Sequence, residues 1–428
     1  MAIMTNTENE ILPPPSERST VIGWLVNNFF SPWYNALLSL IVARLLFVLL
    51  KGGLTWAFTD ARWAVVPNNM RLYLVGQYPS AVEGQIDYIW RLGLCVYLLS
   101  AVIGFTWGVY AKRKEPVGFV LLGIPVVLAF IPLLYAVFST LENAPKTNEA
   151  FATALQILGI DLIALTAFWL GKWRGARLQR YALMLWILYF PVMLLIINGV
   201  GEEFEVLDAP LAVIPTRFWG GLLLSLLLAV SGIVFSFPIG VTLALGRQSR
   251  LPIIRSLSII YIEFIRGVPL ISLLFMGQVM LNLFIPGDVT LDRVIRAMVP
   301  ITLFSAAYLA ENVRGGLQSI SQGQYEAAHA VGLNGFQTMT FIILPQALRA
   351  VIPVMVGQFI SLFKDTTLVS IVGMVDLMGI AKGVLANPAY VGTQREVYLF
   401  ISVFYFIFSY ALSYTSHRLE IVLGVGER

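Results

Sequence analysis

Ionisable side chains are scarce in this sequence, and those inside its apolar stretches are the first candidates for chemistry. Of the 428 residues, 58% are apolar and only 12% are charged. A charged group surrounded by hydrocarbon is costly, so it must pair with another group or line a polar cavity. Such groups can receive an ammonium or a carboxylate, relay a proton, or form a structural ion pair. The candidates are Arg44, Lys51, Asp161, Glu263, Arg266, Glu311 and Asp365.

Three of these candidates lie in the first half of the chain. Arg44 and Lys51 occupy the first apolar stretch and Asp161 the fourth. A proton or ion relay is one interpretation; a structural ion pair, with Arg44 or Lys51 reaching toward the membrane interface, is the other. We favour the ion pair for these three. For the four candidates in the second half, a role on a transport route or in gating and a purely structural role are equally well supported.

No catalytic or metal site is expected. Cys95 is the only cysteine, and the only two histidines, His329 and His417, are far apart in sequence. Gly171-Lys172 is followed by Trp173, so the chain has no phosphate-binding loop of the G-x-x-x-x-G-K-[ST] type. We therefore expect a protein that is not an enzyme and holds no cofactor, with any ATP and magnesium bound by a partner.

The elements that position these residues are apolar stretches of about twenty residues, the length at which a helix crosses ~30 Å of hydrocarbon. Because backbone groups in lipid must be bonded internally, these stretches are predicted to be helices, which gives an all-α polytopic membrane protein of about ten spans. The predicted spans are Ala36–Phe58, Trp90–Ala111, Val117–Phe138, Phe151–Gly171, Leu183–Val200, Phe218–Leu245, Ser256–Phe284, Val294–Asn312, Ala350–Val372 and Val397–Tyr414.

Lysine and arginine in short alternate loops predict the orientation in the membrane. They follow the second, fourth and sixth spans, which makes that side cytoplasmic and puts both termini there. The long loop Thr59–Tyr88 then faces outward. The net charge of +4 does not indicate nucleic-acid binding, because these cations are scattered through the loops. They are Lys112, Arg113, Lys114, Lys172, Arg174, Arg177, Arg180, Arg247, Arg250 and Arg255.

An acidic, proline-containing stretch divides the chain into two bundles. We predict a cytoplasmic tail at 1–30, an N-terminal bundle of about five spans at 31–200, and a periplasmic linker at 201–216. A second bundle, the core, follows at 217–419, and a cytoplasmic tail at 420–428 ends the chain.

The loop at about 320–345 carries the most specific pattern in the core. Glu326-Ala327-Ala328 is followed after three residues by Gly332, and after nine more by Ile342-Ile343-Leu344-Pro345. Good helix formers precede Gly332, which can take φ > 0 and end a first short helix. A second is predicted at Phe336–Ile343, with the Leu344-Pro345 step ending it before the next span. A helix–turn–helix with a small face suits docking into a groove of a partner.

This pattern resembles the EAA loop of membrane subunits of ABC importers, and three further stretches extend the resemblance. Tyr261–Leu270, Ala307–Gly316 and Lys364–Val369 resemble the Y-x-E-x-x-R-G-x-P-L, A-Y-x-A-E-x-x-R-G-G and K-D-T-S/T-L-V stretches of polar-amino-acid permeases. The chain is most similar to the M-type permease subunit of general L-amino-acid importers, which also carries extra spans before the core. The resemblance covers about 217–419.

The resemblance implies a type I ABC importer core in a bacterial inner membrane that moves L-amino acids by alternating access. It implies an ABC ATPase dimer, a second permease subunit in a heterodimer, a periplasmic amino-acid-binding protein, surrounding lipid and no nucleic acid. An ion-coupled secondary amino-acid transporter, with Asp161 or Glu311 taking the ion, is the alternative. The ATPase-coupling residues implied are Glu326, Ala327, Ala328, Gly332, Leu344 and Pro345. The substrate-route candidates are Arg266, Glu311, Arg314, Asp365, Thr366 and Thr367.

Overall fold

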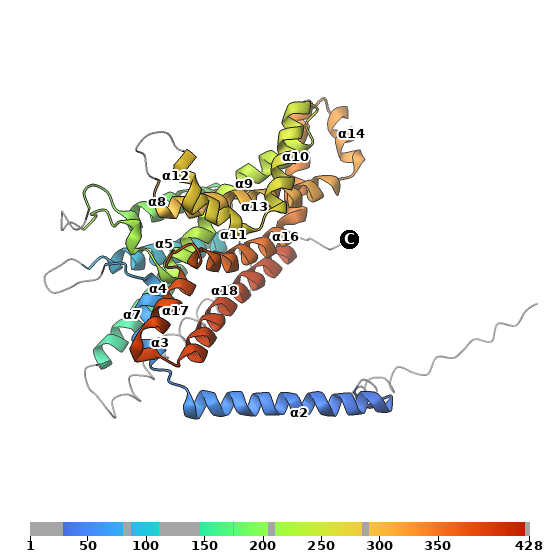
Figure 1. Ribbon diagram of the computed structural model, residues 1–428. Helices are drawn as coiled ribbons and strands as arrows, with labels where there is room; N and C mark the ends of the chain where they lie inside the picture. Colours follow the sequence, from blue (N-terminus) through green and yellow to red (C-terminus); the bar gives the residue numbers. More distant parts are fainter. Residues whose placement is uncertain are drawn as a thin grey trace, which may run out of the picture.

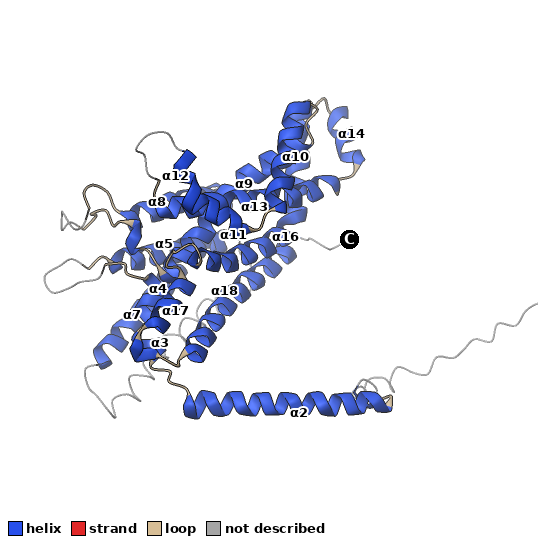
Figure 2. Cartoon of the chain, in the orientation of Figure 1, coloured by secondary structure: helices blue, strands red, loops and turns tan. Residues whose placement is uncertain are grey.

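The computed structural model describes residues 29–79, 87–110, 146–173, 175–203, 210–284 and 291–423. Within these ranges the chain is helical, with isolated bridges but no strand, as Figure 2 shows. Eight helices are long and apolar enough to cross a membrane, and a pair bent by 103° forms a possible ninth span. The predicted all-α, multi-pass architecture is therefore confirmed.

The predicted spans correspond closely to these helices. Eight of the ten predicted spans match one long helix each, and most of their ends differ from the prediction by a few residues. The exception is the predicted span Ala350–Val372, because its helix, Gly335–Ser370, begins much earlier. The predicted span Ser256–Phe284 is the bent pair, because α10 (Pro252–Gly267) ends at Val268-Pro269 and α11 (Leu270–Phe275) leaves in a new direction. The predicted span Val117–Phe138 lies outside the described residues.

The first long helix stands apart from the others. α2 (Trp33–Thr55) continues through the π-helical η3 (Trp56–Asp60), and none of their residues is buried. Figure 1 shows α2, in blue, running separately from the helices above it. An apolar surface of this kind is compatible only with hydrocarbon or another apolar surface around it.

The helices α5 (Ile89–Tyr110), α7 (Lys146–Trp173) and α8 (Gly175–Asn198) form the rest of the described N-terminal bundle. Glycines bring α5 and α7 into backbone contact: a Cβ on Gly104 would lie 2.1 Å from the carbonyl oxygen of Ala164. A Cβ on Gly108 would lie 2.1 Å from the carbonyl oxygen of Phe168. This small-xxx-small spacing is a common way for membrane helices to pack closely.

The segment predicted as a long outward loop is folded onto the core. It contains α3 (Val65–Asn68) and α4 (Met70–Val75), whose buried Val65 and Tyr73 pack in one cluster with Leu222 and Val397. The close approach extends to the backbone, since a Cβ on Gly76 would lie 2.5 Å from Cα of Gly220. This segment thus joins the two bundles.

The long helices of the core run from one of its ends to the other, and short helices lie at both ends. Its elements are α9 (Gly221–Arg247), α10, α11, η5 (Met276–Met280), α12 (Leu281–Phe284), α13 (Arg293–Gln318), α14 (Gln322–Ala330), α15 (Gly335–Gln337), η6 (Thr338–Ile343), α16 (Leu344–Asp365), η7 (Thr366–Ser370), α17 (Leu377–Ala386), η8 (Pro388–Tyr390) and α18 (Gln394–Leu423). We call the end that carries α14 and α15 the loop end. The opposite end, with 210–216 and α17, is the linker end (Figure 1).

The described part of the predicted linker is held in place rather than extended freely. Arg91, fully buried, donates from Nε (3.0 Å) and Nη2 (2.6 Å) to the carbonyl of Pro210. Its Nη2 also donates to the carbonyl of Ala212 at 2.9 Å. One hydrophobic cluster contains Ile197 and Ala212 together with Leu228 of α9, so the two bundles share a core at the linker end.

Candidate coupling loop and charged network

The loop predicted to contact an ATPase has the shape expected of it. α14 ends at Ala330, and Gly332 follows with φ 85°. The N–H of Gly332 donates to the carbonyl of His329 (2.9 Å) and the N–H of Leu333 to that of Ala328 (3.1 Å), which is the Schellman arrangement. A Cβ on Gly332 would meet nothing within 4 Å in this chain, so the backbone angle alone requires the glycine.

The second half of the loop begins with a cap that the sequence analysis did not identify. The side chain of Asn334 accepts from the N–H of Gln337 (2.9 Å), and the Gln337 side chain accepts from the N–H of Asn334 (3.1 Å). This reciprocal capping box fixes the direction in which α15 leaves the turn. The signal was present, since Asn334 stands three residues before a glutamine.

Two apolar side chains flank the turn and are almost fully exposed. Val331 is 81% exposed and Phe336 is 77% exposed. Glu326 and Ala327 are also exposed, whereas Ala328 is 5% exposed and faces inward, so the three alanines do not form one continuous outer face. The surface that this loop exposes is therefore the turn itself with the outer side of α14.

The predicted helix end at Leu344-Pro345 is wrong. The π-helical η6 leads straight into α16, and one helix runs from Gly335 to Ser370. Proline lacks an N–H, but at the start of α16 this loss is tolerated, and the wider π turn before it accommodates the backbone. The loop that carries the predicted coupling residues is thereby continuous with a membrane helix.

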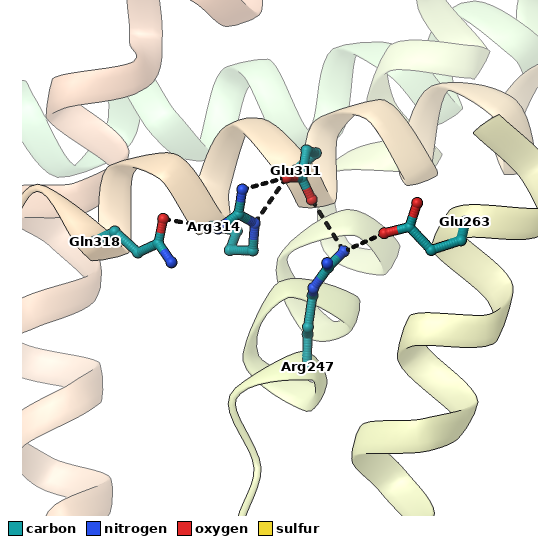
Figure 3. Close-up of polar contacts among 5 residues, drawn as sticks. All are labelled: Arg247, Glu263, Glu311, Arg314 and Gln318. Carbon is teal, nitrogen blue, oxygen red and sulfur yellow. Dashed lines mark hydrogen bonds and ion pairs between the residues drawn. The ribbon is translucent and has the colours of Figure 1, made fainter. Parts of the chain in front are cut away.

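Charged side chains from three helices form a network near the loop end (Figure 3). Nη1 of Arg247 on α9 lies 2.9 Å from Oε1 of Glu263 on α10 and 3.1 Å from Oε2 of Glu311 on α13. Arg314 bonds the other oxygen of Glu311, and its Nη1 donates to Gln318 at 2.7 Å. Both oxygens of Glu311 are therefore engaged, and the network joins α9, α10 and α13.

The remaining route candidates lie in different surroundings. Arg266 lies over the ring of Tyr308, 5.4 Å from its centroid, and its Nε is buried without a hydrogen-bond partner. The Thr366 hydroxyl donates to the carbonyl of Phe363 (2.7 Å), and the Thr367 hydroxyl donates to that of Lys364 (2.9 Å). The hydroxyls of both threonines thus bond to backbone carbonyl groups at the end of α16.

Asp365 is separated from Glu311. Gln358 on α16 accepts from Asn312 (2.6 Å) and donates to the carbonyl of Ser305 (2.8 Å), which fixes the register of α16 against α13. Asp365 follows Gln358 by seven residues, or about 10 Å of helix toward the linker end. Within the described ranges, the side chain of Asp365 makes no hydrogen bond or ion pair, although the charge of the adjacent Lys364 acts on it. The two acids therefore belong to two places along the core.

The predicted ion pair in the first half of the chain is wrong for the residues described. Arg44 and Lys51 are exposed on the isolated α2. Asp161 is 4% exposed on α7, and its Oδ1 has no hydrogen-bond partner. Sequence spacing could not reveal this, because it does not say which spans are neighbours.

Outside the membrane-spanning helices, one carboxyl has an altered pKa. Asp376 is fully buried at the start of α17 and accepts from the N–H groups of Gly379 (2.9 Å) and Met378 (3.2 Å). Burial raises the pKa of Asp376 to about 7, against the opposing effect of these hydrogen bonds. The neutral acid is the form that this site favours.

Residues 236–420 match the family described as the binding-protein-dependent transport system inner membrane component. The inner membrane amino-acid ABC transporter permease protein YhdY of Escherichia coli (strain K12) is 34% identical over 414 residues, or 95% of this chain and 94% of that protein. The chain belongs to the family of amino-acid ABC transporter permeases. The resemblance drawn from the four motifs is confirmed.

Two further comparisons accompany this assignment. The glutamate/glutamine/aspartate/asparagine transport system permease protein BztC of Rhodobacter capsulatus is 34% identical to the permease over 95% of each chain. Among solved structures, the crystal structure of an amino acid ABC transporter with histidines matches 47% of the permease and 91% of that chain, at 28% identity and a TM-score of 0.43.

Family membership decides between the alternatives that the sequence left open. The permease is a multi-pass transport component and not an enzyme, and ATP hydrolysis belongs to a separate ATPase subunit. The comparisons give no support to an ion-coupled carrier. Permeases of this family work with an ATPase and a substrate-binding protein.

Proposed function

We propose that the permease moves L-amino acids inward across a bacterial inner membrane by alternating access, as one half of a heterodimer with a second permease subunit. The single observation that carries the proposal is the exposed turn at Gly332, with Val331 and Phe336 presented beside it. This turn contacts an ABC ATPase dimer that binds ATP and magnesium. Closure of that dimer moves α14, and the movement passes through η6 into α16 without a break.

In this proposal the loop end is cytoplasmic and the linker end periplasmic. The support is the distribution of lysine and arginine, which places Arg250 and Arg255 beside the loop end. Both termini are then cytoplasmic, and a periplasmic amino-acid-binding protein delivers the substrate to the linker end. The name of the relative BztC suggests acidic amino acids and their amides as the substrate class.

The charged groups of the core have two different roles in this proposal, substrate binding and closure of the route. Asp365, which is unpaired within the described ranges, receives the ammonium of an amino acid in the spans. Arg247, Glu263, Glu311 and Arg314 close the route near the loop end, because the ion pairs of Arg247 with Glu263 and Glu311 hold α9, α10 and α13 together. Opening inward requires these contacts to rearrange, and so the ATPase cycle must favour each arrangement in turn.

Reconstitution in proteoliposomes tests this function. The permease, its second subunit and the ATPase are reconstituted, the binding protein and amino acid are added at the periplasmic side, and uptake is followed with ATP or with an imposed sodium or proton gradient. We expect uptake only with ATP. Uptake driven by an ion gradient without ATP would contradict the proposal and restore the ion-coupled carrier.

A further inference from the structure

An open cavity at the linker end lies where the N-terminal bundle meets the core. It has a volume of about 450 Å³, within the ~300–1,000 Å³ usual for small-molecule sites. Its wall takes Asn198 from the end of the first bundle, Glu203 from the linker, Arg217 from just after it, and Arg293 and Arg296 from the first turns of α13. The cavity is therefore distinct from the charged network, which lies at the other end of α13.

Two of the three arginines of this wall, Arg293 and Arg296, have more hydrogen-bonding capacity than the described chain uses. Within the described ranges Arg293 donates no side-chain hydrogen bond, and its Nε and Nη2 are buried without a partner. Arg296 donates from Nη1 to the carbonyl of Gln278 (2.7 Å), but its Nε is also unpartnered. A guanidinium is always charged and matches a carboxylate in two-point geometry, so such a pair of groups favours an anion.

The acids of the wall are not equivalent. Asp292 is occupied, because it accepts from the hydroxyl of Thr216 and, at 2.8 Å, from the N–H of Val294. Glu203 is exposed and has no side-chain hydrogen bond or ion pair within the described ranges. The cavity thus presents unsatisfied guanidinium groups together with one unpaired carboxylate.

We propose that this cavity is an outer binding site for a zwitterionic amino acid, which it holds on its way from the binding protein to the spans. The α-carboxylate is bound by Arg293 and Arg296, and the α-ammonium by Glu203. The side chain of the ligand is not recognised by these groups, so the site accepts amino acids of different side chains. This inference rests on the proposed function, since it assigns the cavity to the substrate of the importer.

Ligand NMR on the assembled transporter tests the site. Saturation transfer to L-glutamine, repeated with L-alanine, is measured on the complex in nanodiscs without binding protein. The background is Asp365→Asn, so that binding in the spans does not contribute. Arg293→Gln is the main variant because Arg293 donates no bond that the fold needs. Arg395→Gln, an exposed arginine at the start of α18 outside the cavity wall, is the matched control.

We expect Arg293→Gln and Glu203→Gln each to lower affinity at least tenfold, and Arg395→Gln to leave it unchanged. Acetate should compete in wild type and in Glu203→Gln, since it carries only the carboxylate. Equal signals from Arg293→Gln and Arg395→Gln would overturn the proposal. The proposal would also be overturned if Arg293→Gln changed only the stimulation of the ATPase by the binding protein. Arg293 would then contact an acidic side chain of that protein and not a free amino acid.

The outcome is separable from that of the proposed function. ATP-driven uptake by wild type with no saturation transfer at this cavity would reject the outer site and leave the importer intact. A signal that depends on Arg293, from a complex that takes up no amino acid with ATP, would keep the site and reject the importer.

Discussion

Oε2 of Glu311 lies 3.1 Å from Nη1 of Arg247, so that an acid of α13 and a base of α9 meet near the loop end of the core. Glu311 is 21% exposed and Arg247 24% exposed at their side chains, so solvent only partly screens the pair. Arg314 bonds the other side of the same carboxylate. Three predictions concern transport, and three concern folding and topology.

Arg247→Gln and Glu311→Gln should each slow ATP-driven uptake about fivefold, the effect of losing roughly 1 kcal/mol from a partly exposed ion pair. The double variant should be slower by less than the two single losses combined, because both changes remove the contact between Arg247 and Glu311, while each also removes one contact of its own. Glu263→Gln is the control: Glu263 is 54% exposed and bonds only Arg247, so its loss should change uptake less than twofold. Additive losses in the double variant would show that the pair does not act as a unit.

Gly332→Val should leave the permease folded and inserted but uncouple ATP hydrolysis from uptake, or release the ATPase. At φ 85° a β-branched residue carries strain of about 1–3 kcal/mol, so the turn changes shape instead. Gly332→Asn should keep most uptake, since asparagine tolerates this backbone region. Gly335→Ala is the control, because its Cβ meets nothing and its φ is not positive. Subunit retention, ATPase rate and uptake are measured together. Normal coupling of ATP hydrolysis to uptake in Gly332→Val would show that this loop is not the coupling element.

Asp365→Asn should weaken uptake without affecting assembly with the ATPase, because Asp365 makes no hydrogen bond or ion pair within the described ranges. The expected change is a rise in the substrate concentration needed for half-maximal uptake, measured on the complex in proteoliposomes. Thr367→Val is a neighbouring control, since the Thr367 hydroxyl is used within its own helix. Unchanged kinetics in Asp365→Asn would exclude it as the ammonium acceptor.

Gly108→Ala should destabilise the N-terminal bundle by about 1–3 kcal/mol, because the new Cβ would meet the Phe168 carbonyl at 2.1 Å and α5 must move away from α7. The matched control is Gly93→Ala on the same helix, where a Cβ meets nothing within 4 Å. That change should be neutral or slightly stabilising. Thermal unfolding of both variants in detergent measures the difference, and equal Tm values would mean that α5 and α7 are not in backbone contact.

The stability of the permease should fall between about pH 4 and pH 7 through Asp376. Its folded-state pKa of about 7 is above the ordinary value of 3.8, so the native state favours the protonated acid. The resulting stabilisation is complete below the ordinary value and is lost as the pH rises through 7. Asp376→Asn keeps a neutral acceptor for the two N–H groups and should flatten Tm against pH across this window. Parallel curves for the two proteins would contradict the pKa assignment.

Cysteine labelling tests the orientation, and the chain is well suited to it because its only cysteine, Cys95, is 5% exposed. Glu203→Cys at the linker end should react with a membrane-impermeant maleimide in intact spheroplasts. Arg250→Cys, exposed beyond the end of α9, should react only after lysis. The reverse pattern would invert the topology, and with it the side on which the ATPase docks.

The sequence predicted those features that depend on local pattern. Spans of apolar residues are recognisable because hydrocarbon thickness sets their length, and the turn at Gly332 because helix formers stop at a residue that can take positive φ. The family motifs also located Glu311 and Arg314. The sequence did not reveal Arg247 as their partner, since it is 64 residues from Glu311 and was counted only as a loop cation.

The features that were missed depend on which elements are neighbours. α3 and α4 were predicted as loop because they are short, and their burial comes from Leu222 and Val397, which follow much later in the chain. The helix end at Leu344-Pro345 was misplaced because the preference of proline for a helix start was read as a stop signal. The side of α14 occupied by Ala328 was likewise set by packing against the core and not by composition.

The docking of α3 and α4 on the core has a consequence for biosynthesis. The N–H of Arg62, just before α3, bonds Glu396 of α18, 334 residues later. At ~5–20 residues per second, a ribosome needs roughly 20–70 s to supply that partner. Throughout this time Val65 and Tyr73 have no α18 to cover them, so a nascent chain stalled before α18 should be an open substrate for membrane proteases. Synthesis of α18 thus completes the packing around α3 and α4.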